Sequence, residues 1–310
     1  MAGLDKPRLI CIVGPTGVGK TGMALELAGR WGGEIVSADS MQVYRHMDIG
    51  TAKPTREERS RIPHHLLDVV DPDEPFDASR YIGLARKVIE ELQHQRKPVF
   101  VVGGTGLYIR VLLGGLIDGP GADEALRSEL KQEMNCRGKD HLYGRLQARD
   151  PRAAERIDRH DGVRIIRALE VLELTGRSIV EHQQEHRFGD APYEAVRIGL
   201  RLDRERLNDR IDWRAERMIA EGFAEEVRGL LDRGWGGSLK SMQSLGYRHM
   251  IDFLTGRQGL DQAMELIKRD TRRYAKRQMT WFAADREVGW LDPADVESAS
   301  ERISRFLDRP

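Results

Sequence analysis

The stretch RLICIVGPTGVGKT, residues 8–21, decides the fold of this 310-residue chain. The mostly apolar run 8–13 predicts a buried β-strand, and GPTGVGKT (14–21) fits the pattern GxxxxGK[ST] in full. The segment KTGMALELAGRWG (20–32) then predicts a helix. In this order the glycines let successive backbone amides face one anion, and the helix adds its positive end. The sequence therefore predicts a phosphate cradle, the P-loop.

The neighbouring strands leave the fate of the bound phosphate open. An ATPase needs an Asp at the end of a neighbouring strand to hold Mg²⁺, whereas VFVVGG (99–104) ends in Gly103 and Gly104. The short LLDVVD (66–71) offers a substitute acid, but its flanking prolines make a loop an equal interpretation. The cradle is well supported, and nucleotide hydrolysis is not.

Short apolar runs alternate with helical patterns through the first third of the chain. Runs 34–38 and 98–104 predict buried strands, and 79–97 carries apolar residues at helical spacing. Strands that alternate with helices indicate a parallel sheet with covering helices.

Residues 121–190 have a different pattern, because they are helical and charged with almost no strand-like run, and the β pattern returns at 193–203. We therefore expect an α/β protein with a P-loop NTPase-like parallel sheet core. That core is predicted to consist of residues 1–118 and 195–310, with a helical insertion domain at 119–194.

The overall composition is that of an ordinary globular protein. Lys plus Arg equal Asp plus Glu at 50 each, so net charge gives no sign of a nucleic-acid partner and any basic surface must be local. Two cysteines without a CxxC pair support neither a disulfide framework nor a zinc site. No run is long enough for a membrane helix or a signal-peptide core, so we expect a cytoplasmic protein without membrane association.

A carboxylate and a hydroxyl follow two of the predicted strands. Asp39 comes just after the strand 34–38, and Thr105 follows the strand 98–104. Ligands of open α/β sheets bind at the carboxyl ends of the strands, so both side chains are expected beside the P-loop. The alternative for each residue alone is a helix cap, Asp39 before SMQVYRH and Thr105 before GLYIRVLL. Together at one sheet edge they favour a functional site.

Two downstream helical stretches concentrate positive charge. Residues 207–227 place three arginines at i, i+4 and i+7, for which a solvated face is the simpler interpretation. These arginines are Arg210, Arg214 and Arg217. In 267–282, six basic residues accompany a single acid, Asp270, with aromatic residues between them. This local excess suits a phosphate backbone and a stacked base.

The chain resembles the bacterial tRNA dimethylallyltransferase family in seven motifs, which occur in the family's order. They are GPTGVGKT, SADSMQVYRHMDIGTAKPT, PHHLLDVVDP, VVGGTGLYI, RIIRALEV, SLGYRHM and AKRQMTWF. The resemblance runs from about residue 8 to 292. SADSMQVYRHMDIGTAKP is the most specific motif, because ordinary P-loop kinases have nothing like it.

The resemblance implies transfer of a dimethylallyl group from dimethylallyl diphosphate to the exocyclic amine of the adenosine 3′ of the anticodon, position 37, in tRNAs that read codons beginning with U. Diphosphate is then the leaving group and N6-isopentenyladenosine the product. Mg²⁺ is the implied cofactor, and the anticodon stem-loop of tRNA the implied partner. No attack on phosphorus occurs, which would explain the missing ATPase acid. Nothing in the sequence signals an oligomer, so a monomer is the default.

The resemblance also implies roles for individual residues. Asp39 matches the proposed general base, Thr105 a residue that hydrogen-bonds around the target base, and Arg214 an arginine that reaches the diphosphate. Since the target amine lies in a stacked anticodon loop, the adenosine is expected to flip into a channel through the core. Thr21 is in addition the implied Mg²⁺ ligand. The implied diphosphate-binding residues are Gly14, Thr16, Gly17, Gly19, Lys20 and Thr21.

Family contacts with tRNA fall on five parts of the chain. Two positions depart from the family pattern: Val163 stands where a Gln is usual, and Ala283 where an Arg commonly follows TWF, with Arg286 nearby. The implied tRNA-binding residues are Asp39, Ser40, Met41, Gln42, Thr105, Val163, Arg164, Arg167, Lys240, Ser241, Arg272, Lys276 and Arg277.

Three other functions remain open from the sequence. A P-loop small-molecule or nucleotide kinase would phosphorylate its acceptor from ATP, and an adenylate isopentenyltransferase would alkylate a free nucleotide. The helical insertion and the basic stretch 268–277 argue against both, because a nucleotide-sized acceptor does not require them. A P-loop protein that binds RNA without chemistry would have no use for Asp39 and Thr105.

Overall fold

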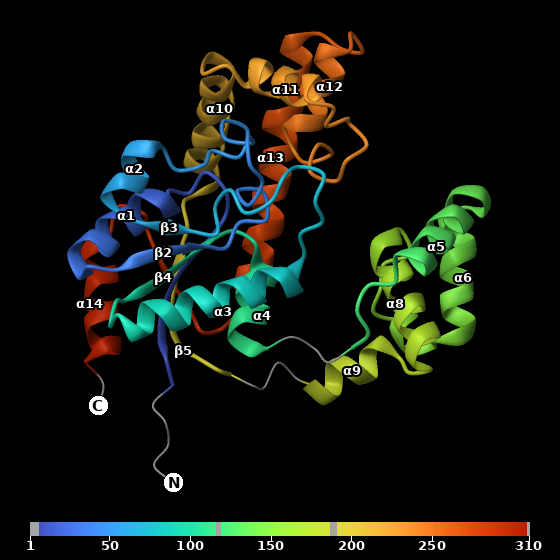
Figure 1. Cartoon of the computed structure of the whole chain (residues 1–310), viewed down its shortest axis with the longest axis horizontal. Helices are drawn as coiled ribbons and strands as arrows, with labels where there is room; N and C mark the ends of the chain where they lie inside the picture. The colour runs from blue at the N-terminus through green and yellow to red at the C-terminus, as the bar shows by residue number, and fades with distance from the viewer. Residues whose placement is uncertain (1–5, 116–118, 187–190, 309–310) are drawn as a thin grey trace. The chain divides into compact units, whose positions relative to one another are not determined.

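A computed structural model describes residues 6–115, 119–186 and 191–308 of the chain. Six strands within these residues form one parallel sheet in the order β3-β2-β4-β1-β5-β6 (Figure 1). This confirms the predicted parallel α/β core. The strands are β1 Arg8–Val13, β2 Glu34–Ser37, β3 His64–His65, β4 Val99–Gly103, β5 Glu194–Leu200 and β6 Val288–Leu291.

The predicted strands lie within a few residues of the observed ones, and two strands at the sheet's edges were not predicted. β3 has two residues, both histidine, and β6 has four residues. Neither is long enough to show a period, and both depend on pairing with a longer neighbour, β2 or β5. Edge strands of this kind follow from tertiary pairing rather than from their own sequence.

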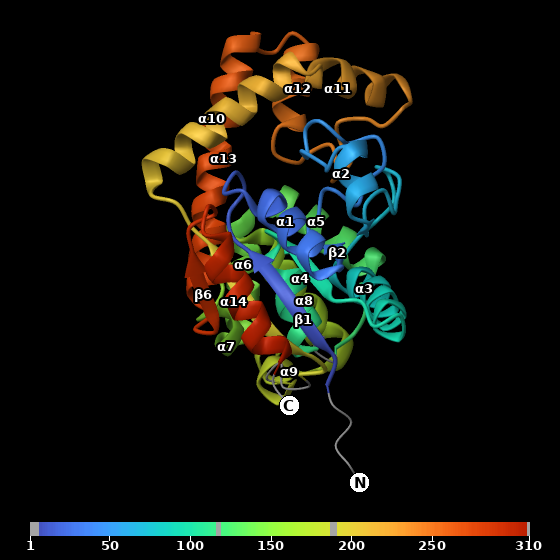
Figure 2. The same ribbon diagram turned by 90° about the vertical axis from the view of Figure 1, so that its left-hand side faces the viewer.

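Helices cover both faces of the sheet. Helix α1 (Lys20–Trp31) and helix α14 (Val296–Leu307) pack in one core with Ile10 and Ile12 of β1. Helix α3 (Ala78–His94) lies on the opposite face, against β2 and β4 (Figures 1 and 2). Because side chains of a strand alternate between its faces, the continuous apolar run of β1 supplies both cores.

Four helices after β5 form a helical lobe that belongs to the same compact unit as the sheet. The stretch 207–227 was predicted as one helix, but it breaks before Gly222, which has a φ of 95°. This left-handed conformation is open to glycine and ends a helix. The basic stretch 267–282 lies within one helix, as predicted. The lobe consists of α10 Arg204–Ala220, α11 Phe223–Asp232, α12 Tyr247–Leu254 and α13 Leu260–Ala283.

The segment between β2 and α3 is tied to the helical lobe by one carboxylate. Glu226 of α11 accepts hydrogen bonds from the backbone amides of Asp48 (2.8 Å), Ile49 (2.6 Å) and Gly50 (3.1 Å). The hydroxyl of Tyr247 also donates to Glu226, at 2.7 Å. Three converging amides form a nest for an anion, and here the anion is part of the chain. The loop 48–50 is therefore docked on the lobe. The same segment also contains the short helix α2 Arg56–Arg61.

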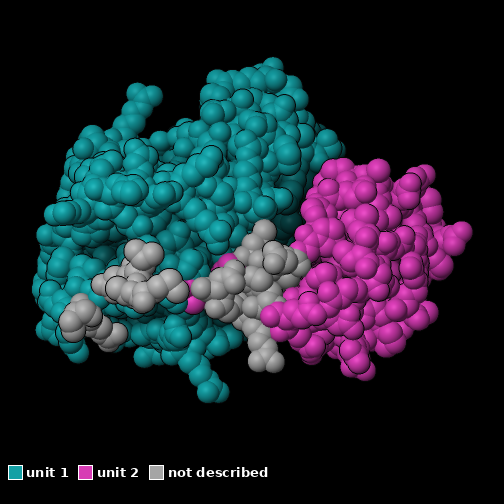
Figure 3. Space-filling model, turned by 60° about the horizontal axis from the view of Figure 1, so that its bottom comes forward, with its two compact units in different colours: residues 1–113, 192–310 teal, residues 114–191 magenta. Residues whose placement is uncertain are grey.

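Residues 114–191 form a second compact unit (Figure 3), and its secondary-structure elements in the described residues are helices. Its first predicted boundary, between 118 and 119, touches residues 116–118, outside the described residues; its second, after 194, falls three residues beyond Ala191. A buried core that includes Leu130, Leu142 and Leu169 holds the unit together. It follows α4 (Gly106–Gly114) and contains α5 Glu124–Arg137, α6 Lys139–Arg149, α7 Pro151–Ala154, α8 Gly162–Thr175 and α9 Ile179–His186.

No helix in the described part of the chain combines the length and the apolar character that a membrane span requires.

Gly103→Ala should destabilise the sheet at the edge where β2 and β4 end. A Cβ atom at Gly103 would lie 2.1 Å from the carbonyl oxygen of Ala38, which is backbone and cannot turn aside. We expect a loss of about 1–3 kcal/mol in the free energy of unfolding, measured by urea denaturation. Gly83→Ala in α3 is the matched control, because nothing lies within 4 Å of that position. It should be neutral or stabilising, since alanine is the better helix former. Equal effects of the two substitutions would contradict the tight fit at Gly103.

Candidate functional site

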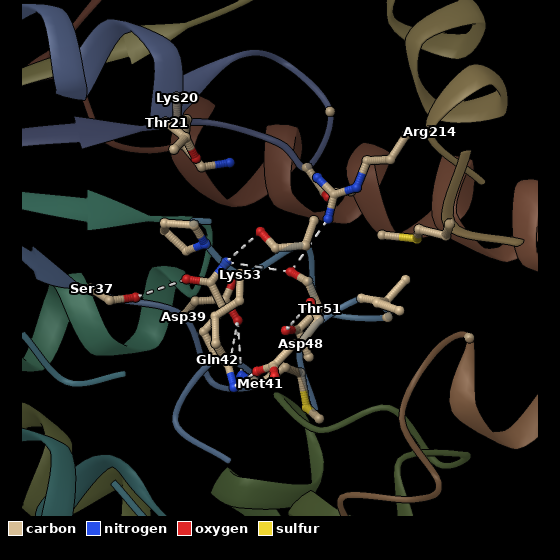
Figure 4. Close-up of a pocket in the computed structure, with 18 of the residues that line it drawn as sticks. Lys20, Thr21, Ser37, Asp39, Met41, Gln42, Asp48, Thr51, Lys53 and Arg214 are labelled. Atoms are coloured by element: carbon tan, nitrogen blue, oxygen red, sulfur yellow. Dashed lines mark hydrogen bonds and ion pairs between the residues drawn. The ribbon is translucent and has the colours of Figure 1, made fainter. Parts of the chain in front are cut away.

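A cavity of about 1230 Å³ opens at the carboxyl ends of the strands (Figure 4). Its lining comes from the P-loop, from the segment after β2, and from helices α10 and α13 of the helical lobe. The predicted site residues that line it are Thr16, Gly17, Gly19, Lys20, Thr21, Asp39, Ser40, Met41, Gln42 and Arg214. The topology thus brings together predicted site residues that lie as much as 198 residues apart, from Thr16 to Arg214.

The P-loop has the backbone that an anion cradle requires. Gly14 and Gly19 have φ angles of 145° and 108°, a region that L side chains rarely adopt. A Cβ atom at Gly14 would in addition lie 2.7 Å from the carbonyl oxygen of Leu200, so the loop passes directly over the end of β5. Helix α1 begins at Lys20 without a side-chain cap, which leaves its first amides available to a ligand.

Lys20 points into the cavity and is folded back onto its own loop. Its Nζ donates a hydrogen bond to the carbonyl oxygen of Pro15 at 2.7 Å. Burial lowers the pKa of Lys20 from 10.5 to about 8; the charge of Asp39 opposes this shift and that of Arg214 adds to it. The site disfavours its own cation, so a bound anion would stabilise the charged lysine.

Arg214 enters the same cavity from α10 (Figure 4). Its only hydrogen bond within the described residues is a long one, 3.5 Å from Nη2 to the carbonyl oxygen of Thr51. Burial lowers the pKa of Arg214; Asp39 opposes the shift and Arg217 adds to it. Lys20 and Arg214 thus leave positive charge in the cavity that Asp39 does not fully balance. A polyanion of diphosphate size would supply the missing negative charge.

Asp39 lies two residues beyond the end of β2 and closes a turn. Its Oδ1 accepts hydrogen bonds from the amides of Met41 (2.8 Å) and Gln42 (3.4 Å). The alternative of a helix cap is therefore partly realised, but on a turn, because 40–46 is not helical. No hydrogen bond from a described residue reaches Oδ2. One carboxylate oxygen fixes the side chain and the other is free to accept a proton.

Thr105 stands beside the cavity rather than in its lining. Its Oγ1 accepts a hydrogen bond from the amide of Ser40 at 3.0 Å and lies 3.3 Å from the Ser40 hydroxyl. The hydroxyl thus binds the segment after β2 and does not cap α4. Since Ser40 follows Asp39, the three residues form one polar corner, which we call the Asp39 corner.

The cavity can accommodate a magnesium ion only with help from a ligand. No group of three or more His, Cys, Asp or Glu among the described residues could hold a metal ion. The Thr21 hydroxyl lines the cavity and makes no hydrogen bond with a described residue. Asp68, in the stretch 66–71 considered above, is engaged by Lys53 (2.7 Å) and Arg59 (2.7 Å). Mg²⁺ commonly binds with one protein oxygen, substrate phosphates and water, and the residues present fit that arrangement.

Several predicted tRNA-binding side chains have structural partners. Gln42 accepts from Ser37 and donates to the carbonyls of Thr51 (3.3 Å) and Ala52 (3.2 Å). Ser241 is 1% exposed and donates to the carbonyl of Pro72. Arg167 pairs with the buried Glu170, and Arg272 pairs with Asp212 at 2.7 Å. The buried Ser241 can meet RNA only if it exchanges its partner, whereas the half-buried Arg167 and Arg272 keep guanidinium N–H groups outside these pairs.

Other predicted tRNA-binding side chains are exposed. Val163 is 81% exposed at the start of α8, where Arg164 is exposed too. On α13, Lys268 and Arg272 are neutralised by acids of α10. Three basic residues are exposed and form no ion pair with a described residue: Lys276 and Arg277 on α13, and Lys240 before α12. The basic surface of α13 is thus narrower than the sequence suggested.

Two further residues of the cavity, Tyr274 and Gln278, were missed as site residues. Both lie on α13 and line the cavity. Burial and the charge of Asp39 raise the pKa of Tyr274 to about 12, although the charge of Arg277 and a hydrogen bond with Gln278 act to lower it. Its phenol therefore stays protonated. Gln278 is 7% exposed on the same helix as the buried Ala275 and Phe282. The available signal was a polar residue at helical spacing from apolar ones, on the face of α13 that is buried.

Comparison with known proteins agrees with this architecture. The family model described as IPP transferase matches residues 42–285. The chain is 58% identical over 304 residues to tRNA dimethylallyltransferase 2 of Syntrophus aciditrophicus (strain SB), with 98% of each chain covered. The crystal structure of a tRNA isopentenylpyrophosphate transferase from Bacillus halodurans is similar with a TM-score of 0.72 and 42% identity, covering 97% of this chain and 96% of that one. A eukaryotic dimethylallyltransferase acting on tRNA gives a TM-score of 0.82 at 28% identity, covering 98% and 80%.

Proposed function

This chain belongs to the IPP transferase family, and from that premise we propose that it transfers a dimethylallyl group from dimethylallyl diphosphate to the exocyclic amine of an adenosine in tRNA. The chain is an enzyme, a tRNA prenyltransferase. The acceptor is the adenosine 3′ of the anticodon, position 37, in tRNAs that read codons beginning with U. One observation carries the proposal: the anion cradle and a carboxylate with a free oxygen open into the same cavity.

The residues around the cavity divide the reaction between them. The P-loop amides, Lys20 and Arg214 hold the diphosphate and stabilise the negative charge that develops as the allylic C–O bond breaks. The electron pair of that bond leaves with the diphosphate, and the adenine nitrogen forms the new bond to carbon. Asp39 accepts the proton that the nitrogen loses. The amine is conjugated to the ring and weakly nucleophilic, so its orientation by the Asp39 corner contributes as much as basicity.

Magnesium belongs to the proposal as well. Thr21 would hold the ion together with oxygens of the diphosphate, and the ion would neutralise charge on the leaving group. We take the enzyme to act as a monomer in the cytoplasm, where its tRNA substrate is found.

The main alternative is a kinase built on the same core, and one assay separates the two. Purified protein is mixed with Mg²⁺, labelled dimethylallyl diphosphate and unmodified tRNA that carries adenosine 3′ of the anticodon. We expect label in the tRNA, at that adenosine after nuclease digestion and chromatography. Transfer of label only from the γ-phosphate of ATP would establish a kinase instead, and label in free adenylate an adenylate isopentenyltransferase.

We expect the affinity for dimethylallyl diphosphate to fall as the pH rises above about 8. Lys20 has a pKa of about 8 in the empty site, and a bound diphosphate would keep it charged. Binding above that pH then takes up a proton, and the affinity should fall about tenfold per pH unit.

Lys20→Arg is the matched control, because arginine stays charged throughout this range. Its affinity should be independent of pH between about pH 7.5 and pH 9.5 when measured by calorimetry. A wild-type affinity that is equally flat would contradict the depressed lysine.

A further inference from the structure

Gln278 of α13 connects two loops of the site through its side-chain amide. Its Oε1 accepts a hydrogen bond from the amide of Thr16 at 2.8 Å, and its Nε2 donates to the carbonyl of Gly104 at 2.9 Å. The side chain is 7% exposed. A buried amide with both ends bonded to backbone is expensive to leave half-satisfied, so the contact fixes both loops at once.

The first of these loops is the P-loop. The peptide between Pro15 and Thr16 is held at both ends, its carbonyl by Lys20 (2.7 Å) and its amide by Gln278 (2.8 Å). The backbone amide of Thr16 is therefore not available to an anion, and Thr16 could reach the diphosphate only through its hydroxyl. When Lys20 moves from Pro15 to the anion, Gln278 is the remaining restraint on this peptide.

The second loop carries the acceptor side of the cavity. Gly104 precedes Thr105, whose hydroxyl binds the amide of Ser40 in the Asp39 corner. A Cβ atom at Gly104 would lie 2.3 Å from Nε2 of Gln278, so the glutamine occupies the space that the glycine leaves open. Gln278 is thus packed closely against Gly104, next to the Asp39 corner, as well as against Thr16 of the P-loop.

We propose that Gln278 is a positioning residue that holds the diphosphate cradle and the Asp39 corner in a fixed relation to each other. The inference rests on the proposed function: in prenyl transfer the diphosphate leaves the same carbon that the nitrogen attacks, so the two parts of the site must keep a fixed distance. In the proposed role, Gln278 contacts neither the reacting nitrogen nor the reacting carbon. Its effect is transmitted through the Pro15–Thr16 peptide and the Gly104–Thr105 peptide.

Two substitutions separate positioning from mere packing. Gln278→Met keeps the volume and removes both hydrogen bonds. Gln278→Glu restores the pattern only when protonated, since a neutral carboxyl can accept from Thr16 and donate to Gly104. Once ionised, it faces the Gly104 carbonyl and the bound anion without a proton to donate. Burial should raise the pKa of the new carboxyl into the measurable range.

The probe is inorganic diphosphate with Mg²⁺, titrated by calorimetry and expressed as a ratio to wild type at each pH, which cancels the probe's own ionisation. We expect Gln278→Met to bind about tenfold more weakly at every pH. Gln278→Glu should approach wild type near about pH 5.5 and bind at least about tenfold more weakly at about pH 8. Gln258→Met is the matched control, because Gln258 also donates to a backbone carbonyl, that of His249 at 2.9 Å, and does not line the cavity.

A diphosphate affinity of Gln278→Met equal to wild type, or a Gln278→Glu ratio that does not change with pH, would overturn the inference. If Gln278→Met does not fold, the Gln278→Glu titration decides alone. The second arm measures prenyl transfer at saturating substrates, where the turnover number of Gln278→Met should fall about tenfold. Normal turnover there would refute the link to the Asp39 corner. Absence of transfer in the wild type would refute the proposed function and leave the diphosphate result intact.

Discussion

Asp39→Asn should lower the turnover number of prenyl transfer by about 10²–10⁴, the usual contribution of a general base. The side-chain amide of Asn is not basic enough to accept the proton that the adenine nitrogen loses. Asn keeps an Oδ1 that can accept from the amides of Met41 and Gln42, so the turn after β2 should survive. The substitution therefore isolates the proton acceptor from the fold of the corner.

Single-turnover transfer to tRNA under saturating donor measures this effect, with the melting temperature recorded alongside. Asp77→Asn is the matched control, because its Oδ1 also accepts a backbone amide, that of Arg80 at 2.9 Å, outside the lining of the cavity. The control should turn over like wild type. A turnover number for Asp39→Asn within a factor of about three of wild type would remove Asp39 from proton transfer.

Arg214→Met should reduce kcat/KM for the prenyl donor by about 10²–10³, the loss expected when one preorganised donor to a developing anion is removed. The same substitution should raise the melting temperature of the empty protein. Burial and Arg217 disfavour the guanidinium, and its hydrogen bond to the Thr51 carbonyl is long at 3.5 Å. An apolar side chain of similar length relieves that electrostatic cost, an example of activity held at the expense of stability.

Arg206→Met, on the same helix, tests whether any lost arginine has this effect. Arg206 is exposed and pairs with Asp203 and Asp292, contacts of small energy at a surface. It should change neither kcat/KM nor stability appreciably. A melting temperature of Arg214→Met below that of wild type, or an unchanged kcat/KM, would show that the arginine supports the fold rather than the leaving group.

Most of the core fold could be predicted because its strands are long enough to carry a pattern. β1 and β4 are continuous apolar runs. The P-loop motif identifies β1 as the strand that precedes it and α1 as the helix that follows it. The edge strands β3 and β6 were missed, since two and four residues show no period. The break at Gly222 was missed for another reason. A single glycine is tolerated inside a helical pattern, and the contacts that α11 makes with α12 and with the loop 48–50 cannot be read from the sequence.

The site was predictable where a motif couples residue type to spacing. Lys20, Thr21 and Asp39 follow strand ends, so sheet topology alone brings them to one edge. Arg214 entered through the family resemblance, because nothing in a basic helix tells which arginine faces inward. The partner of Ser241 was not predictable, since the carbonyl of Pro72 meets it only in the folded chain. The pair of Arg167 with Glu170 is local, at i,i+3 on α8, and the sequence could have suggested it. Gln278 was missed because a glutamine in a basic helix reads as solvent-exposed.

The docking of Glu226 has a consequence for how this protein can vary between species. The carboxylate binds the main chain of residues 48–50 and none of their side chains. This contact therefore does not restrict which amino acids stand at positions 48 and 49. Gly50 is restricted, however, since a methyl group there would lie 2.2 Å from the ring of Phe223. In a lineage where Glu226 is lost, compensation should appear as a new acid on α11 or α12 rather than as a change in the loop.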